Sequence, residues 1–370
     1  MRVICDRTTL LRAWRTAARF VPTRSPKPAL RHVKLVAGED GVSMIATDLE
    51  TSIRIDVPSC AVDAPGAALM PVARVGPILR DSRDDQLIIE SDGCTTHVRG
   101  DGCDVSLVAP SPSEMPDVGV FTAQRYHVMP ARFFCELARR TVFATDNENG
   151  RYALDGVLLE LSDNQVIAVA TDRRRLALQR GPAVSVAGHK TTENTIIPTR
   201  AMRLFERALA GHEGDIQLAV CRGCVMIHSD CLTMYARLMN GCYPAWRDVV
   251  PTPTRAVTIT LPAGQCRAAV GQAATATSAD HRGIDFTFGD GKAVLAAHGA
   301  ETGEARVVLP VAYAGAEVSV TLDARYVNDF LRMLDPDQCF TFQIKDADSA
   351  VLCTTDDGYS YVIMSMARDR

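Results

Sequence analysis

Residues that can bind a metal ion gather in one stretch of the chain. The segment AVCRGCVMIHSDC contains Cys221, Cys224, His228 and Cys231, and thiolate and imidazole groups at short spacing are the usual ligands of zinc. The Arg-Gly between the first two cysteines, however, predicts a tight turn. The corresponding segments ESDGCTTHV and KDADSAVLC have no pair of cysteines at that spacing. We therefore expect no bound metal.

Carboxylates and arginines are combined in a second stretch, ATDRRRLAL (170–178). Three consecutive arginines are compatible with a phosphate site or with a basic cluster of the nuclear-localisation type. Asp48, Asp155 and Asp172 are candidate metal ligands of a nucleic-acid hydrolase. Ala-Thr-Asp also occurs at 46–48, however, 124 positions upstream, and Asp repeated at the ends of apolar runs favours Asx-type turns. We interpret the stretch as one unit of a repeat.

Composition places the chain among ordinary globular proteins. It has 370 residues, a net charge of −4 and 47% hydrophobic residues, so its length predicts two or three domains. We find no apolar run of about 18 residues, no signal-peptide core in MRVICDRTTLL, and no nucleotide-binding glycine motif. Twelve cysteines without framework spacing fit a reducing compartment. We expect a cytoplasmic protein without a cofactor.

Six similar units follow one another along the chain. Each begins where a short apolar run meets a Pro or Asp that can start a helix; these starters are Asp6, Pro71, Pro130, Pro198, Pro262 and Asp323. A helix-like stretch such as TTLLRAWRTAARF follows, and then hairpin-like runs such as DGVLLELSDNQVIAVATD. Longer and shorter links alternate, so the full period is two units, roughly 125 residues. The pattern predicts three similar α+β domains, at 1–123, 124–253 and 254–370.

Positive charge is concentrated in the six predicted helices. They contain 15 arginines and four acids, whereas the rest of the chain has 25 basic and 40 acidic groups. Two triplets share the spacing i, i+3, i+7, which puts each on one helical face: Arg12, Arg15 and Arg19, and Arg200, Arg203 and Arg207. A solvated face explains any single helix. Six net basic helices in an acidic protein predict a common surface that binds phosphates without regard to sequence.

Tandem α+β repeats with basic helices resemble the bacterial β sliding clamp, the processivity subunit of the replicative DNA polymerase III. The similarity covers the whole length and includes RYALDGVLLEL (151–161), ATDRRRLAL, YPAWRDVVP (243–251) and YVIMSM (361–366). It implies a non-catalytic, head-to-tail homodimeric ring of the DNA-clamp fold, with helices inside and sheets outside. Twelve helices at about 8–10 Å spacing give a ring roughly 32–38 Å across at the helix axes, wide enough to thread a duplex.

The resemblance also implies the partners. The ring would encircle double-stranded DNA in the cytoplasm, at the nucleoid, and would be opened by a separate ATP-driven clamp loader. It would hold the polymerase III alpha subunit, the clamp loader, other polymerases and mismatch-repair proteins through short Leu- and Phe-bearing peptides. By position, the peptide pocket would comprise Leu154, Thr171, Arg173, Arg174, Arg175, Leu176, Pro244, Val249, His281, Tyr326, Val362, Met364 and Met366.

Two further sets of residues follow from the same resemblance. The positions expected to bind DNA are Arg24, Arg80, Arg151, Tyr152 and Arg200. Arg151 has a rival role as a paired arginine at a strand end. The subunit interface would join DVSLVAP (104–110) to AATATSA (273–279), with contacts from Val105, Leu107, Thr275 and Ala276.

The chain departs from the family pattern at several pocket positions. Arg173 stands where glycine is common, Asp248 where arginine is frequent, and His281 where an aromatic gate occurs. The Met-Ser-Met ending replaces Met-Pro-Met. Two alternatives therefore stay open: a clamp-fold paralogue specialised for repair, and a metal-dependent nucleic-acid hydrolase built on repeated domains.

Overall fold

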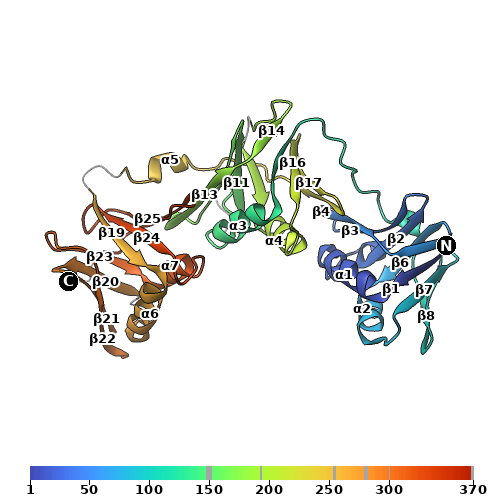
Figure 1. The fold of residues 1–370 in the computed structure, drawn as a ribbon, viewed down its shortest axis with the longest axis horizontal. Coiled ribbons are helices and arrows are strands. Elements are labelled where there is room, and N and C mark those ends of the chain that lie inside the picture. Colours follow the sequence, from blue (N-terminus) through green and yellow to red (C-terminus); the bar gives the residue numbers. More distant parts are fainter. Residues whose placement is uncertain (147–151, 192–193, 253–255, 279–281, 300, 368–370) are drawn as a thin grey trace. The chain divides into compact units, whose positions relative to one another are not determined.

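The computed structural model of the chain describes residues 1–146, 152–191, 194–252, 256–278, 282–299 and 301–367. Within these residues 26 strands form four antiparallel sheets (Figure 1). The α-helices are α1 (Arg7–Ala17), α2 (Val72–Asp81), α3 (Ala131–Val142), α4 (Thr199–Leu209), α5 (Trp246–Val249), α6 (Ala263–Ala273) and α7 (Ala324–Leu331). The 3-10 helices are η1 (Ala18–Phe20), η2 (Pro28–Arg31), η3 (Pro112–Glu114) and η4 (Ala274–Ala276). None of the described helices is long and apolar enough to cross a membrane.

The first of two compact units comprises Met1–Cys135, Val184–Lys190 and Arg200–Met239. Its smaller sheet has the order β5-β1-β7-β8-β9, formed by β5 (Cys60–Ala64), β1 (Arg2–Asp6), β7 (Gln86–Ser91), β8 (Thr95–Gly100) and β9 (Cys103–Val108). Its larger sheet runs β14-β10-β16-β17-β18-β4-β3-β2-β6, formed by β14 (Val184–Val186), β10 (Tyr126–Pro130), β16 (Asp215–Cys221), β17 (Cys224–Ser229), β18 (Leu232–Arg237), β4 (Thr51–Val57), β3 (Gly41–Thr47), β2 (His32–Gly38) and β6 (Gly66–Pro71). In this unit α1 packs beside α2 and contacts β3 and β4 of the larger sheet (Figure 1).

The second unit comprises Glu136–Ala183, Thr191–Thr199 and Asn240–Arg370. Its larger sheet has the order β15-β11-β12-β13-β26-β25-β24-β19, formed by β15 (Thr195–Pro198), β11 (Gly156–Ser162), β12 (Gln165–Thr171), β13 (Arg175–Pro182), β26 (Tyr359–Ile363), β25 (Val351–Thr354), β24 (Cys339–Ile344) and β19 (Val257–Pro262). The smaller sheet runs β22-β21-β20-β23, formed by β22 (Gly303–Pro310), β21 (Lys292–Gly299), β20 (Gly283–Gly289) and β23 (Val318–Asp323). Helices α6 and α7 pack side by side against these sheets.

The six predicted helices are confirmed, and each begins directly after its predicted starter. Asp6 caps α1 by accepting the amide of Thr9, and Asp323 caps α7 by accepting the amide of Arg325. The prolines differ from the prediction in one detail, because each ends a strand instead of occupying the first helical position. Pro71 and Pro262 have φ near −70° and ψ near 125°, which suits both the end of a strand and the N-cap position of a helix.

Two of the sheets extend across the segments that the repeat predicts as separate domains. In the first unit β18 pairs with β4, Met234 lying opposite Ile53. In the second unit β13 pairs with β26, Ala177 lying opposite Tyr361. Backbone hydrogen bonds therefore join consecutive repeats into shared sheets, and the two compact units do not coincide with the three predicted domains. The three-domain division stays a prediction.

The 15 arginines that the sequence assigns to the helices lie at the surface, with one exception. Arg12, Arg15 and Arg19 are exposed along α1 and η1, opposite the buried face that contains Leu10 and Trp14. Arg140 of α3 was predicted to belong to the same basic surface, and this is wrong. Its side chain is only 4% exposed and forms ion pairs with Glu136 at 2.9 Å and Asp357 at 2.8 Å.

Arg140 instead forms several contacts in the interior of the second unit. Its guanidinium also donates to Gln179 Oε1 at 2.9 Å and lies 5.0 Å from the centre of the Tyr359 ring. Partial burial would raise the pKa of Asp357, but hydrogen bonds from Arg140 and Thr355 outweigh this effect and lower it to about 2. A buried guanidinium needs such partners because an unpaired charge in the interior is strongly unfavourable.

We predict that Asp357→Asn lowers the free energy of unfolding by about 1–2 kcal/mol at neutral pH, since Asp357 is partly exposed and Arg140 is buried. The folded-state pKa of Asp357 lies below its unfolded value of 3.8. The stabilisation is therefore complete above about pH 4 and is lost as the pH falls towards 2. Urea unfolding at several pH values measures this difference.

The matched control is Asp356→Asn, which removes the same charge from the exposed neighbouring position. It should change the free energy of unfolding by less than about 0.5 kcal/mol. Equal effects of the two substitutions would show that the Arg140 ion pair is not the cause.

Candidate functional site

A cavity of about 170 Å³ lies in the second unit, where three strands and a short helix meet. Its lining is mainly apolar and consists of Thr171, Arg173, Arg175, Leu176, Pro244, Trp246, Val249, Val362 and Met364. The strand register explains how the floor forms. Thr171 of β12 lies opposite Leu176 of β13, which lies opposite Val362 of β26. Side chains in one such row share a face of the sheet.

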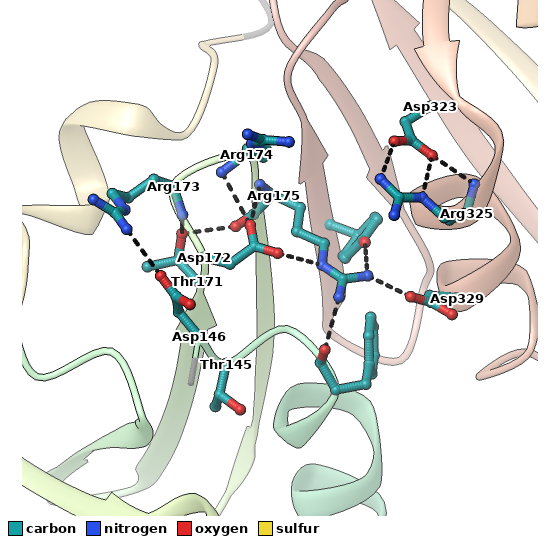
Figure 2. A network of polar contacts seen from close by, with 12 residues as sticks. Thr145, Asp146, Thr171, Asp172, Arg173, Arg174, Arg175, Asp323, Arg325 and Asp329 are labelled. Atoms are coloured by element: carbon teal, nitrogen blue, oxygen red, sulfur yellow. Dashed lines mark hydrogen bonds and ion pairs between the residues drawn. The ribbon is translucent and has the colours of Figure 1, made fainter. Parts of the chain in front are cut away.

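A tight turn between β12 and β13 shapes one wall of the cavity. The Asp172 carboxylate accepts the amides of Arg174 and Arg175, each at 3.0 Å, and the Thr171 hydroxyl donates to the Arg175 carbonyl at 2.7 Å (Figure 2). Asp48 forms the same turn at the first Ala-Thr-Asp and accepts the amides of Glu50 and Thr51. The predicted Asx turns are thus confirmed at these two aspartates.

The residue after each aspartate adopts a left-handed backbone conformation. Arg173 has φ +74° and Leu49 has φ +78°, a region that glycine occupies at no steric cost. This conformation explains why glycine suits the position that Arg173 holds. The Arg173 side chain is 58% exposed and forms an ion pair with Asp146 at 3.0 Å, so a charged group stands at the rim of the cavity.

Arg175 differs from its two neighbours because its guanidinium is committed to the protein. It is 10% exposed, donates to Asp172 at 2.9 Å, to the Phe143 carbonyl at 2.9 Å and to Asp329 at 2.5 Å (Figure 2). It also lies 4.6 Å from the centre of the Tyr326 ring. Burial alone would lower the pKa of Arg175, but the surrounding oxygen atoms raise it overall. Arg175 is therefore a structural part of the wall, whereas the Arg173 and Arg174 side chains are exposed.

Helix α5 forms the opposite wall, and the carboxylate of Glu160 holds it in place. The Glu160 carboxylate accepts a hydrogen bond from the indole N–H of Trp246 at 3.1 Å. It also accepts hydrogen bonds from both terminal nitrogens of the Arg247 guanidinium, at 2.9 and 2.5 Å. The Arg247 guanidinium stacks on the Trp246 ring at 4.2 Å. Sequence reasoning missed Trp246 as a lining residue, although an aromatic residue next to Pro244 and Val249 in YPAWRDVVP was a usable signal.

Four other described residues that were predicted for the pocket, Leu154, Arg174, Tyr326 and Met366, lie outside this lining. Leu154 is buried, Tyr326 packs under Arg175, and the amide of Met366 donates to the Thr321 carbonyl. Arg174 turns its backbone to the site, its carbonyl accepting the amide of Met364. His281 lies outside the described residues.

The residues predicted to contact DNA are at the surface where the structure describes them. Arg24 is exposed and Tyr152 is 38% exposed. Arg80 forms an ion pair with Asp81 at 2.8 Å, and Arg200 forms one with Asp48 at 2.6 Å. Both arginines are about 60% exposed, so a phosphate can reach their guanidinium groups. Arg151 lies outside the described residues.

The residues predicted for the subunit interface divide between surface and core. Thr275 is exposed and Val105 is half-buried, whereas Leu107 and Ala276 are buried within the protomer. The neighbouring Val108 is 78% exposed and was not predicted. The alternation of strand β9 accounts for the difference, because consecutive side chains point to opposite faces.

The candidate metal ligands serve other purposes in the structure. Cys221 and Cys224 lie opposite each other where β16 turns into β17, with Gly223 at φ +74°. This is the tight turn that the Arg-Gly pair predicts. Asp155 stands at a bend, and its backbone carbonyl accepts the amide of Thr199. Among the residues that the structure describes, no group of three His, Cys, Asp or Glu side chains is placed to hold a metal ion.

Comparison with known proteins gives consistent matches along the chain. Residues 1–118 match the family model of the DNA polymerase III beta subunit, N-terminal domain, and residues 128–245 match that of its central domain. The chain is 25% identical to the beta sliding clamp of Salmonella typhimurium over 376 residues, covering 99% of this chain and 100% of the relative. It is 26% identical to the beta sliding clamp of Caulobacter vibrioides over 378 residues, with the same coverage.

Solved structures show the same fold over the full length. The DNA polymerase III subunit beta of Pseudomonas aeruginosa superimposes with a TM-score of 0.90 at 23% identity, covering 100% of both chains. The DNA polymerase sliding clamp of Bacillus subtilis gives a TM-score of 0.92 at 19% identity, again covering 100% of both chains. The Pseudomonas aeruginosa clamp has also been solved bound to griselimycin, with the same TM-score of 0.90.

The turn at Arg173 leads to a stability prediction. Arg173→Gly and Arg173→Ala both remove the ion pair with Asp146, but only glycine relieves the left-handed backbone. We expect the glycine variant to be more stable than the alanine variant by about 1 kcal/mol, measured by chemical unfolding. The pair Leu49→Gly and Leu49→Ala is the matched control and should show a gap of the same sign. Equal stabilities at position 173 would contradict a strained turn.

Proposed function

Because this chain belongs to the family of the bacterial DNA polymerase III beta subunit, we propose that it is a DNA sliding clamp. In this role it encircles duplex DNA and keeps the replicative polymerase on its template. The observation that carries the proposal is the position of the helical arginines. Of the 15 arginines that the sequence assigns to the helices, all except Arg140 are exposed, so the net basic helices can face phosphates although the whole chain has a net charge of −4.

Weak, non-specific contacts suit this task. A ring holds DNA by topology, so its arginines need not bind any one phosphate tightly. Arg200 is 59% exposed beside the Asp48 carboxylate, whose side chain is only 5% exposed. Arg80 has a carboxylate partner, Asp81, at 2.8 Å, and because both of these side chains are exposed, their ion pair contributes little energy. A passing phosphate can exchange with the carboxylate at small cost, which favours sliding over fixed binding.

Two sheet edges that have no partner strand among the described residues support the closure of a ring. Strand β9 is one edge of the five-stranded sheet, and β22 is one edge of the four-stranded sheet. Each edge presents an exposed valine, Val108 at 78% and Val308 at 50%. The segment Ala274–Ala276, in which the interface was predicted, packs beside β22. Pairing β9 of one copy with β22 of another would bury both edges in a head-to-tail dimer.

The cavity described above is our proposed site for partner peptides. Leu176, Val362 and Met364 form an apolar floor, and a flexible methionine accommodates different anchors. Val249 and Met364 remain 46% and 43% exposed, so apolar surface is available to a ligand. Partners held on a common ring gain effective concentration, and weak peptide contacts are then sufficient.

The carboxylates of the alternative hydrolase have structural roles instead. Asp172 holds a turn and the Arg175 guanidinium, and Asp48 holds the equivalent turn and pairs with Arg200. These contacts favour a binding protein over a metal-dependent nuclease.

A topological experiment tests the clamp. The protein is loaded onto nicked circular DNA with the clamp loader of its own organism and ATP, and the complex is isolated by gel filtration. We expect the protein to elute with the circle and to leave when a restriction enzyme linearises the DNA. A protein that binds phosphates without encircling the duplex would stay on the linear form, and that result would overturn the proposal.

A second experiment tests the pocket separately. Fluorescence anisotropy of a labelled Gln-Leu-x-Leu-Phe peptide should report saturable binding. Val249→Asp or Met364→Asp should weaken it at least about tenfold, because a carboxylate would face an apolar anchor. Val184→Asp, at a position 62% exposed on β14, is the matched control and should bind normally. Failure of the wild type to bind would point to a specialised paralogue and leave the topological result unaffected.

A further inference from the structure

Two cysteines that the proposed function does not use face each other across neighbouring strands in the first unit. Cys5 of β1 and Cys60 of β5 are directly opposite in the antiparallel register. Their sulfur atoms are 2.7 Å apart and share a thiol–thiol hydrogen bond. Residues opposite each other in such a ladder have Cα separations that match those of disulfide-bonded cysteines.

The surrounding backbone fixes this juxtaposition. The amide of Asp6 donates to the Ser59 carbonyl at 3.2 Å, one position beyond the cysteine pair. Ser59 has φ +61°, so a left-handed turn directs the chain into β5 at Cys60. Bringing the two sulfur atoms to bonding distance therefore requires only a small adjustment of the side chains, with the strands already paired.

The two thiols differ in access and in acidity. Cys5 is fully buried, whereas Cys60 is half-buried on an edge strand. The hydrogen bond with Cys5 lowers the pKa of Cys60, although burial and the Asp6 carboxylate oppose this effect. The same hydrogen bond raises the pKa of Cys5, and burial, Cys60 and Asp6 raise it further. Cys60 is thus the thiol that ionises first and that an external reagent can reach.

We propose that Cys5 and Cys60 form a dithiol modification site, which a low-molecular-weight disulfide oxidises to a cross-strand disulfide. The Cys60 thiolate attacks one sulfur of the oxidant RSSR, which forms a mixed disulfide and releases one thiolate. Cys5 then attacks Sγ of Cys60 and displaces the second thiolate. The two protons of the cysteines pass to the released thiolates, so two cysteine thiols are oxidised and RSSR is reduced to two RSH.

The expected consequence is a stiffer first unit. The bond would tie edge strand β5 to β1 and close a loop from residue 5 to residue 60. Crosslinks over loops of this length restrict the unfolded chain, so the oxidised protein should melt several degrees higher than the reduced protein. Addition of a dithiol reductant should reverse the shift.

The test uses the full-length protein and oxidised glutathione as the probe. After incubation the protein is denatured and alkylated, and its intact mass is measured. The reduced chain has 12 thiols, and we expect two fewer adducts after oxidation. A tryptic digest should contain residues 3–7 disulfide-linked to residues 55–74, each peptide holding one cysteine.

Two variants establish the order of the steps. Cys5→Ser should stop at the mixed disulfide and gain one glutathione on Cys60. Cys60→Ser should gain none at Cys5, because that thiol is buried. Cys221 and Cys224 of the β16–β17 hairpin also lie opposite each other. The oxidation of this pair is compared with that of Cys5 and Cys60 in the same sample.

Unmodified Cys5 and Cys60 in oxidised wild type would overturn the proposal, whatever happens at Cys221 and Cys224. Glutathione on Cys60 of the wild type that never resolves to the linked peptide would overturn it as well. The digest of the wild type decides both points without depending on how well either variant folds.

Discussion

A buried guanidinium, that of Arg175, is the interaction on which the candidate site depends. It joins the β12–β13 turn through Asp172, helix α7 through Asp329 and the end of α3 through the Phe143 carbonyl. A cation that is 10% exposed keeps its charge in the interior only where oxygen atoms surround it. The arrangement of partners therefore restricts how these three elements can pack. As a result, the β12–β13 turn forms a fixed wall beside the row of Thr171, Leu176 and Val362 at the floor of the cavity.

The same rule separates structural arginines from those that face solvent. Arg140 and Arg175 have several partners within the second unit and lie 4% and 10% exposed. Arg80 and Arg200 have one carboxylate each and are about 60% exposed. Arginines of the first kind stabilise the fold, and those of the second kind remain available to phosphates. The distinction depends on burial and on the number of partners, and neither is visible in the spacing of residues along a helix.

Much of the fold followed from the sequence because its signals are local. Capping by Asp6 and Asp323, the alternation of apolar residues in the hairpins and the Asx turns at Asp48 and Asp172 each involve only a few neighbouring residues. Burial of Arg140 depends on Asp357, which is 217 positions away, and no local pattern reports such a partner. The wall at Trp246 depends in the same way on Glu160. Thr171, Leu176 and Val362, which the family resemblance assigned to the pocket, meet at the cavity because the strand register places them in one row. Leu107 and Ala276, which were predicted for the subunit interface, are buried in the single chain, because a one-residue step along the chain exchanges surface for core.

The sheets that extend across consecutive repeats have a mechanical consequence. Five residue pairs join β18 to β4, and five join β13 to β26. Separating such ladders requires many backbone hydrogen bonds to break together, so these junctions between repeats resist being pulled apart. The edges at β9 and β22 lack such a ladder within the chain that the structure describes. In a ring closed through these edges, the contact between subunits would be the weakest junction. A protein that opens the ring with the energy of ATP would therefore separate the subunits there.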